Sequence, residues 1–181
     1  VFRSLQTSRE NRRISLNGSF AMIYEVSTQP LTADAFKPFG EIIDASGEPD
    51  KIINQGMCGR HHDLAKLDFL SGKVGVSVFN AKARSLPFNL EMMERHPEGT
   101  QAFIPMHQNS FLIIVAHDKN GVPDTPISFI SKPGQGINIS KNTWHGVLCP
   151  LYSPGLFAAI DRIGEGPNLE EHWFKKAWTI I

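Results

Sequence analysis

Several stretches of the chain show the hydrophobic pattern of β-strands. Every second residue between positions 74 and 78 is a valine, whereas residues 111–116 and 156–160 are short apolar runs rich in β-forming side chains. A period of two places alternate residues on one face of a strand, and short apolar runs bounded by turns are typical of buried strands. Residues 127–131 and 136–139 are weaker candidates of the same kind.

Turn-forming residues separate these strands, and helical periodicity is scarce. Residues 118–121 read Asp-Lys-Asn-Gly and residues 132–134 read Lys-Pro-Gly, which is turn chemistry. Thr32 is suited to cap a short helix over residues 33–37, and residues 168–172 are a candidate start of a second helix. Many strands with few short helices predict an all-β fold with a closed or double-sheet architecture.

Length and composition suggest how the chain is organised. With 181 residues it is long enough for one domain with a substantial core and short for two. Residues 1–21 carry four arginines against a single glutamate and lack the apolar segment of a secretory signal. This composition resembles that of a mitochondrial transit peptide, but Met22 followed by a clean folding pattern favours a dispensable N-terminal extension over residues 1–21. We expect a single β-barrel domain over residues 22–181.

The charge and cysteine content of the chain indicate which partners and which cellular compartment to expect. Lys and Arg together number 18, as do Asp and Glu, so no net field attracts nucleic acid or anionic lipid. No apolar run approaches the roughly 20 residues of a membrane helix. Cys58 and Cys149 have neither C-x-x-C spacing nor the density of a secreted disulfide scaffold. These features predict a soluble, cytoplasmic protein with no nucleic-acid or membrane partner.

The densest polar segment runs from Glu94 to Gln101 and leads directly into an apolar stretch. Side chains two apart on a strand point the same way, so Glu94 and His96 are expected on one face and Arg95 on the other. Gln101 follows a turn and can return to the side of Glu94. We therefore interpret this segment as one wall of an active site.

The spacing in this segment resembles the first motif of the cupin superfamily. Glu94, His96 and Gln101 stand where that motif has His, His and Glu, and Gly134 and His145 match the ends of its second motif in position and type. This resemblance implies a cupin-like double-stranded β-helix, or jelly-roll barrel, with a few short helices. It also implies a metal site formed by Glu94, His96, Gln101 and His145. Their oxygen and nitrogen donors suit a divalent ion such as Ni, Mn or Zn.

Two other interpretations of the same residues stay open. In the first, the pocket contains no metal, and His96 and His145 transfer protons. In the second, the histidines are hydrogen-bonded core residues without a chemical role. Trp144 is expected to belong to the core.

Longer strings in the chain resemble those of the ureidoglycolate lyases. The matching strings are Glu94-Arg95-His96-Pro97, residues 99–105, Gly134-Gln135-Gly136, Asn142-x-Trp144-His145, Ile160-Asp161-Arg162 and Arg60-x-His62-Asp63-Leu64. Several ordered motifs spread over most of the chain are more specific than any single short pattern.

This resemblance implies that the protein cleaves ureidoglycolate to glyoxylate and urea during allantoin degradation. The reaction needs a base at the substrate hydroxyl, an acid at the departing nitrogen and a cation for the carboxylate. His96 or His145 is the expected base, with Glu94 as acid partner or ligand. Arg60 and Arg162 are candidates for the carboxylate clamp, since guanidinium groups bind carboxylates through two parallel hydrogen bonds.

The remaining predicted substrate contacts are Gln101 and the pair His62 and Asp63, which is alternatively a solvated polar turn. A homodimer is expected by analogy with the family and because sheet edges need cover. Two further functions remain open: another cupin-type metalloenzyme that acts on a small hydroxy acid, and a non-catalytic ligand-binding barrel. A requirement for iron and oxygen would indicate the former.

Overall fold

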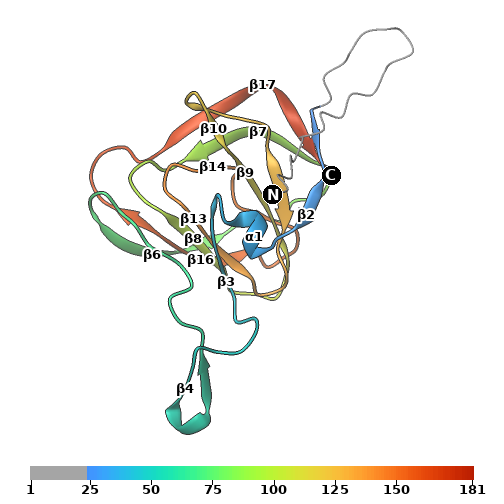
Figure 1. The fold of residues 1–181 in the computed structure, drawn as a ribbon. Coiled ribbons are helices and arrows are strands. Elements are labelled where there is room, and N and C mark those ends of the chain that lie inside the picture. The colour runs from blue at the N-terminus through green and yellow to red at the C-terminus, as the bar shows by residue number, and fades with distance from the viewer. Residues whose placement is uncertain (1–23) are drawn as a thin grey trace, which may run out of the picture.

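The computed structural model describes residues 24–181. The predicted N-terminal extension, residues 1–21, lies outside this range. The described chain is almost entirely β-structure, and its two main sheets face each other in a nearly closed barrel (Figure 1). The predicted all-β, cupin-like barrel is therefore confirmed.

The larger sheet has eight strands, in the order β1-β17-β7-β14-β9-β12-β2, with β15 paired to β9. Its strands are β1 (Glu25–Val26), β17 (Glu170–Ile180), β7 (Phe88–Arg95), β14 (Trp144–His145), β9 (Phe111–Ala116), β12 (Ile127–Ile130), β2 (Thr28–Pro30) and β15 (Cys149–Pro150).

The smaller sheet has five strands, in the order β3-β13-β8-β16-β6. They are β3 (Gly40–Ile43), β13 (Gly136–Ile139), β8 (Gln101–Pro105), β16 (Leu156–Ile163) and β6 (Lys73–Asn80). Two small hairpins complete the β-structure: β10 (Asp118–Lys119) with β11 (Val122–Pro123), and β4 (Lys51–Ile53) with β5 (Cys58–Arg60). The second hairpin turns through a 3-10 segment, η1 (Asn54–Gly56), and stands away from the barrel (Figure 1).

The barrel interior is an apolar core to which both sheets contribute. Phe103 of β8 and Phe157 of β16 pack there with Val115 of β9. A second apolar cluster, which includes Leu112 and Trp144, covers the other face of the larger sheet. Adjacent residues of β9 and β14 therefore belong to different environments, one inside the barrel and one outside.

The strands predicted from the pattern are confirmed, and most of their boundaries agree. β9 and β13 coincide with the predicted residues 111–116 and 136–139, whereas β16 runs three residues beyond the predicted end at residue 160. Helix α1 (Ala33–Phe36) begins as expected after Thr32, whose Oγ1 accepts a hydrogen bond from the Ala35 backbone.

The second predicted helix, over residues 168–172, was wrong. Strand β17 begins at Glu170 and pairs antiparallel with β7. The aromatic and β-branched residues that follow, among them Trp173, Phe174 and Thr179, favour a strand, and pairing with β7 outweighs the short helical pattern. Within residues 24–181, no helix is long and apolar enough to cross a membrane.

Candidate functional site

Two residues of the predicted site are direct cross-strand neighbours in the larger sheet. Strand β14 lies between β7 and β9, and His145 has Glu94 as its partner on one side and Val115 on the other. Paired residues point to the same face of a sheet, and Val115 belongs to the barrel interior. Glu94 and His145 therefore face the interior together.

His96 joins this pair just beyond the end of β7. Its ring centroid lies 5.2 Å from that of His145, and one possible ligand atom each from Glu94, His96 and His145 lie within 4.8 Å of one another. The shared orientation of Glu94 and His96, predicted from their spacing, is thus present. We call these three residues the inner cluster.

The hydrogen bonds of the two histidines leave one nitrogen of each ring free. His96 Nδ1 lies 2.6 Å from the carbonyl oxygen of Asn168, and His145 Nδ1 lies 3.1 Å from that of Gly146. A carbonyl only accepts, so each Nδ1 carries the proton and each Nε2 of a neutral ring is a bare lone pair. Both Nε2 atoms are buried, and neither has a partner among residues 24–181.

Gln101 faces the same interior from the smaller sheet. It begins β8 and pairs with Ile139, an interior residue, and only residues 97–100 separate it from His96. Its side-chain nitrogen donates to Asp161 Oδ2 over 3.5 Å. Its Oε1 is buried and, in the described part of the chain, unpartnered.

The electrostatics of the inner cluster follow from its burial. Desolvation, together with the neighbouring His96, lowers the pKa of His145 to about 4, so the His145 ring is neutral at physiological pH. Burial also raises the pKa of Glu94; His96 opposes this rise, and Glu171, its cross-strand neighbour on β17, adds to it. The cluster thus combines the neutral imidazole of His145 with a carboxyl group that is easier to protonate than usual.

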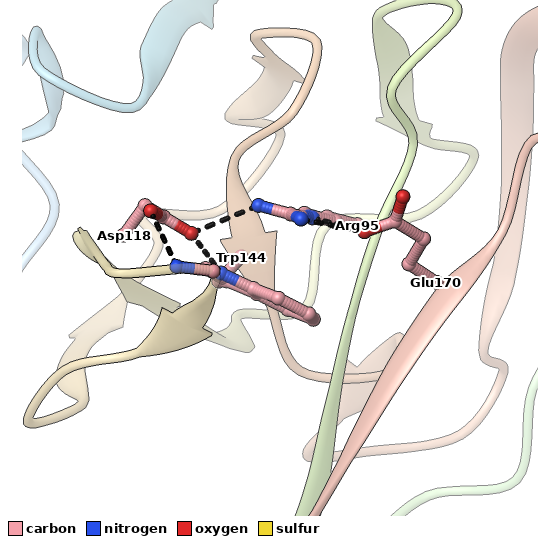
Figure 2. A network of polar contacts seen from close by, with 5 residues as sticks. Arg95, Asp118, Trp144 and Glu170 are labelled. Atoms are coloured by element: carbon pink, nitrogen blue, oxygen red, sulfur yellow. Dashed lines mark hydrogen bonds and ion pairs between the residues drawn. The ribbon is translucent and has the colours of Figure 1, made fainter.

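The alternate residues of β7 and β14 form a different group on the outer face. Figure 2 shows Arg95 between Asp118 and Glu170. The Arg95 guanidinium lies 4.4 Å from the centre of the Trp144 ring. Trp144 Nε1 donates to Asp118 Oδ1 over 2.9 Å. We call Arg95, Asp118, Trp144 and Glu170 the outer cluster. Its geometry confirms the predicted outward direction of Arg95 and the core position of Trp144.

The guanidinium of Arg162, a predicted substrate contact, is engaged elsewhere in the structure. It donates to the backbone oxygen and Oγ of Ser71 and to the backbone oxygen of Glu165. The segment that Ser71 belongs to bonds to the turn between β7 and β8, since the Leu70 amide donates to the Glu98 carbonyl. Arg162 therefore anchors a loop at the site end of the barrel, and its role as a substrate contact stays a prediction.

The other predicted substrate contacts lie at the base of the β4–β5 hairpin. Arg60 contacts His62 Nδ1 over 2.9 Å, and the His62 amide donates to Asp50. Asp63 is exposed and has a positive φ of 55°. In Figure 1 this hairpin stands apart from β7 and β14, and the role of the three residues as substrate contacts stays a prediction.

The chemistry of the donor atoms of the inner cluster and of Gln101 fits a divalent cation. Two imidazole Nε2 atoms, the Gln101 Oε1 and the Glu94 carboxylate are all lone-pair donors. Nitrogen and oxygen ligands of this kind suit ions such as Zn, Ni or Mn. Buried acceptors left without any donor are costly, and a bound cation or a ligand rich in N–H and O–H groups would remove that cost.

The pattern of the sequence did not reveal three residues around this site. They are Asp161, which contacts Gln101, Asn168, which contacts His96, and Glu171, which pairs with Glu94. Each contact depends on pairing between segments that are far apart in the chain. For Asp161 one signal was present, because it continues the alternation of the interior residues Phe157 and Ala159 along β16.

Comparisons with known proteins agree with the geometry. The model of the ureidoglycolate lyase family matches residues 23–181. Ureidoglycolate lyase from Rhodobacter capsulatus is 55% identical over 145 residues, which cover 80% of this chain and 90% of that protein. The protein of the same name from Chelativorans sp. is 46% identical, with 86% and 96% covered, and that from Brucella abortus is 38% identical, with 84% and 91% covered.

Proposed function

The chain belongs to the ureidoglycolate lyase family, and from this premise we propose that it cleaves ureidoglycolate to glyoxylate and urea, as a carbon–nitrogen lyase of the amidine-lyase type in allantoin degradation. The observation that carries this proposal is the inner cluster with Gln101. It gathers proton acceptors and lone-pair donors in a buried site, where interactions with a small polar substrate are strong.

The chemistry requires one net proton transfer. A base removes the proton of the substrate hydroxyl, the oxygen forms a double bond to carbon, and the C–N bond breaks with its electron pair on nitrogen. That nitrogen then takes up a proton and leaves as urea. One carboxyl group can perform both transfers, provided that its two protonation states are close in energy at working pH.

We assign this transfer to Glu94. Burial and the nearby Glu171 raise the pKa of its carboxyl group, which brings it closer to neutral pH, as expected for a group that takes up a proton and returns it. His96 and His145 accept hydrogen bonds from the substrate through Nε2, or bind its hydroxyl and carboxylate oxygens through a cation.

The residues proposed to hold a cation are His96 and His145 through Nε2, Gln101 through Oε1 and Glu94 through one carboxylate oxygen. When bound, such an ion supplies a Lewis acid that polarises the substrate oxygens. In the metal-free alternative, one of the two histidines is the base.

The predicted carboxylate contacts Arg60 and Arg162, together with His62 and Asp63, remain part of the proposal. We further propose a cytoplasmic homodimer. Support for a second copy comes from β6, an outer strand of the smaller sheet on which Val74, Val76 and Val78 are exposed. Exposed apolar stripes on an outer strand favour association.

The direct test is turnover by the purified protein. Incubation with racemic ureidoglycolate and, separately, Ni²⁺, Mn²⁺ or Zn²⁺ is expected to release glyoxylate and urea in equal amounts from one enantiomer. Metal analysis of the protein as isolated decides between the metal-dependent and metal-free forms. An absence of glyoxylate under every metal condition would overturn the proposed reaction.

A further inference from the structure

A buried amide at position 101 can present either of two chemically opposite atoms to the barrel interior. Its Oε1 accepts hydrogen bonds or binds a cation, whereas its Nε2 only donates. The choice matters here because His96 and His145 each already have a buried Nε2 atom without a partner among residues 24–181. An acceptor atom at position 101 adds to the group of atoms proposed to bind a cation, whereas a donor atom there would repel the cation.

One neighbour that contacts this amide is Asp161. It lies on β16, the strand beside β8, and continues the row of interior residues that includes Ala159. Its Oδ2 accepts from Gln101 Nε2 over 3.5 Å. A carboxylate has no proton to donate to Oε1, so the opposite orientation of the amide would place two acceptors together.

We propose that Asp161 is a positioning residue that turns the Gln101 amide so that Oε1, and not Nε2, is available to the ligand of the inner cluster. Gln101 is 7% exposed, so solvent competes little for its amide. This inference rests on the proposed cation site and deepens it. Hydrogen-bond partners of metal ligands typically change metal affinity or activity by about 10–100-fold when they are mutated.

The smaller sheet offers a matched control on its other face. Asn138 is fully buried, and its Nδ2 donates to Glu41 Oε2 over 2.8 Å. This is the same kind of amide–carboxylate bond on the opposite face of the sheet. Asn138 lies between Ile137 and Ile139 in the strand, and because those two residues face the interior, the Asn138 side chain points to the outer side. Glu41→Gln is therefore expected to leave ligand binding unchanged.

The amide orientation is tested directly by NMR in wild type and in Asp161→Asn. The side-chain NH₂ signals of Gln101, assigned by their loss in Gln101→Glu, are expected to show contacts with Asp161 and not with the imidazole protons. Contacts with the imidazole protons in the wild type would overturn the inference, whether or not the protein binds metal or turns over substrate.

The functional consequence is tested by competition for Ni²⁺ with a chromophoric chelator. Asp161→Leu is expected to weaken Ni²⁺ binding about 10–100-fold. In the exchanged pair, Gln101→Glu with Asp161→Asn, the new amide at position 161 donates to one oxygen of the new carboxylate at position 101 and leaves the other oxygen free. This double variant is expected to bind Ni²⁺ at least as tightly as wild type. Thermal melts identify a variant that fails to fold. If Asp161→Leu fails to fold, the Ni²⁺ affinities of Asp161→Asn and of the exchanged pair test the functional consequence instead.

Two results would contradict the functional consequence: Asp161→Leu that binds Ni²⁺ like wild type, or an exchanged pair that binds no better than Asp161→Asn. If the wild type itself binds no Ni²⁺, the proposed cation site fails. The inference is then tested by the KM of Asp161→Asn for ureidoglycolate, compared with that of wild type, and by the orientation of the Gln101 amide measured by NMR. The proposed function fails separately, through absence of turnover.

Discussion

The inner and outer clusters occupy the two faces of the same strands, yet they differ in how completely their polar groups are satisfied. Glu94 and Arg95 are adjacent on β7, as are Trp144 and His145 on β14. In the outer cluster, Arg95 is paired with two carboxylates and an aromatic ring. In the inner cluster, each histidine keeps a buried nitrogen without a partner in the described chain.

This difference distinguishes residues that stabilise the fold from residues proposed to take part in the reaction. A saturated network of charges and hydrogen bonds stabilises a fold, whereas buried groups without partners cost stability, and a ligand that bonds to several of them at once offsets that cost. We therefore expect substitutions on the inner face to reduce activity and substitutions on the outer face to reduce stability.

The largest effect is expected from His96→Ala, which removes one of the free Nε2 atoms. The kcat/KM for ureidoglycolate should fall by about 10²–10⁴-fold, the range for loss of a proton-transfer or substrate-orienting group. The measurement is the initial rate of glyoxylate release.

His107 supplies a matched control for this substitution. Its Nε2 is also buried and unpartnered within residues 24–181, but it lies beyond the far end of β8 and packs on Phe157. His107→Ala should keep near-wild-type turnover. An equal loss of turnover in both variants would mean that the position of His96 in the inner cluster does not account for its effect.

A smaller effect, on stability, is expected from Arg95→Ala. The Arg95 side chain is 14% exposed, and its loss removes charge-assisted hydrogen bonds and a cation–π contact, which together correspond to about 1–3 kcal/mol. Urea denaturation measures the change. The exposed pair Lys119–Asp124, with 3.7 Å between charged atoms, is the comparison, and Lys119→Ala should cost at most about 1 kcal/mol.

The smallest effect concerns the pH dependence of stability at Asp118. Hydrogen bonds from Trp144 and the Gly121 amide lower the pKa of its carboxyl group below 3.8, with help from Arg95. A lowered pKa stabilises the folded state above the unfolded pKa, and this contribution is lost as the pH falls through the folded pKa. Asp118→Asn should therefore show a shallower loss of stability between neutral pH and pH 3 than wild type. Parallel curves would contradict this.

Local features of the inner and outer clusters were predictable from the sequence. The period of two along a strand is a local property, so it correctly placed Glu94 and His96 on one face and Arg95 on the other. The core position of Trp144 and the Thr32 cap are also local. The error over residues 168–172 arose because a short polar run with helical character belongs to a strand whose pairing is decided elsewhere in the chain.

The contacts that define the site chemically depend on register and were not predictable in this way. Asp161 reaches Gln101 across adjacent strands that are 60 residues apart in the chain, and the carbonyl of Asn168 bonds to His96 from 72 residues away. A backbone carbonyl carries no side-chain signal at all. The position of Arg60 on a hairpin that stands apart from the barrel was likewise not visible in the hydrophobic pattern.

The most direct test of the account compares neighbouring residues on opposite faces of β14. His145→Ala and Trp144→Phe are assayed together for glyoxylate release and for thermal stability. We expect His145→Ala to lose at least about 10²-fold in kcat/KM, and Trp144→Phe to keep near-wild-type turnover and to melt at a lower temperature. A His145→Ala variant that turns over ureidoglycolate like wild type would contradict the central claim that the inner face of these strands performs the chemistry.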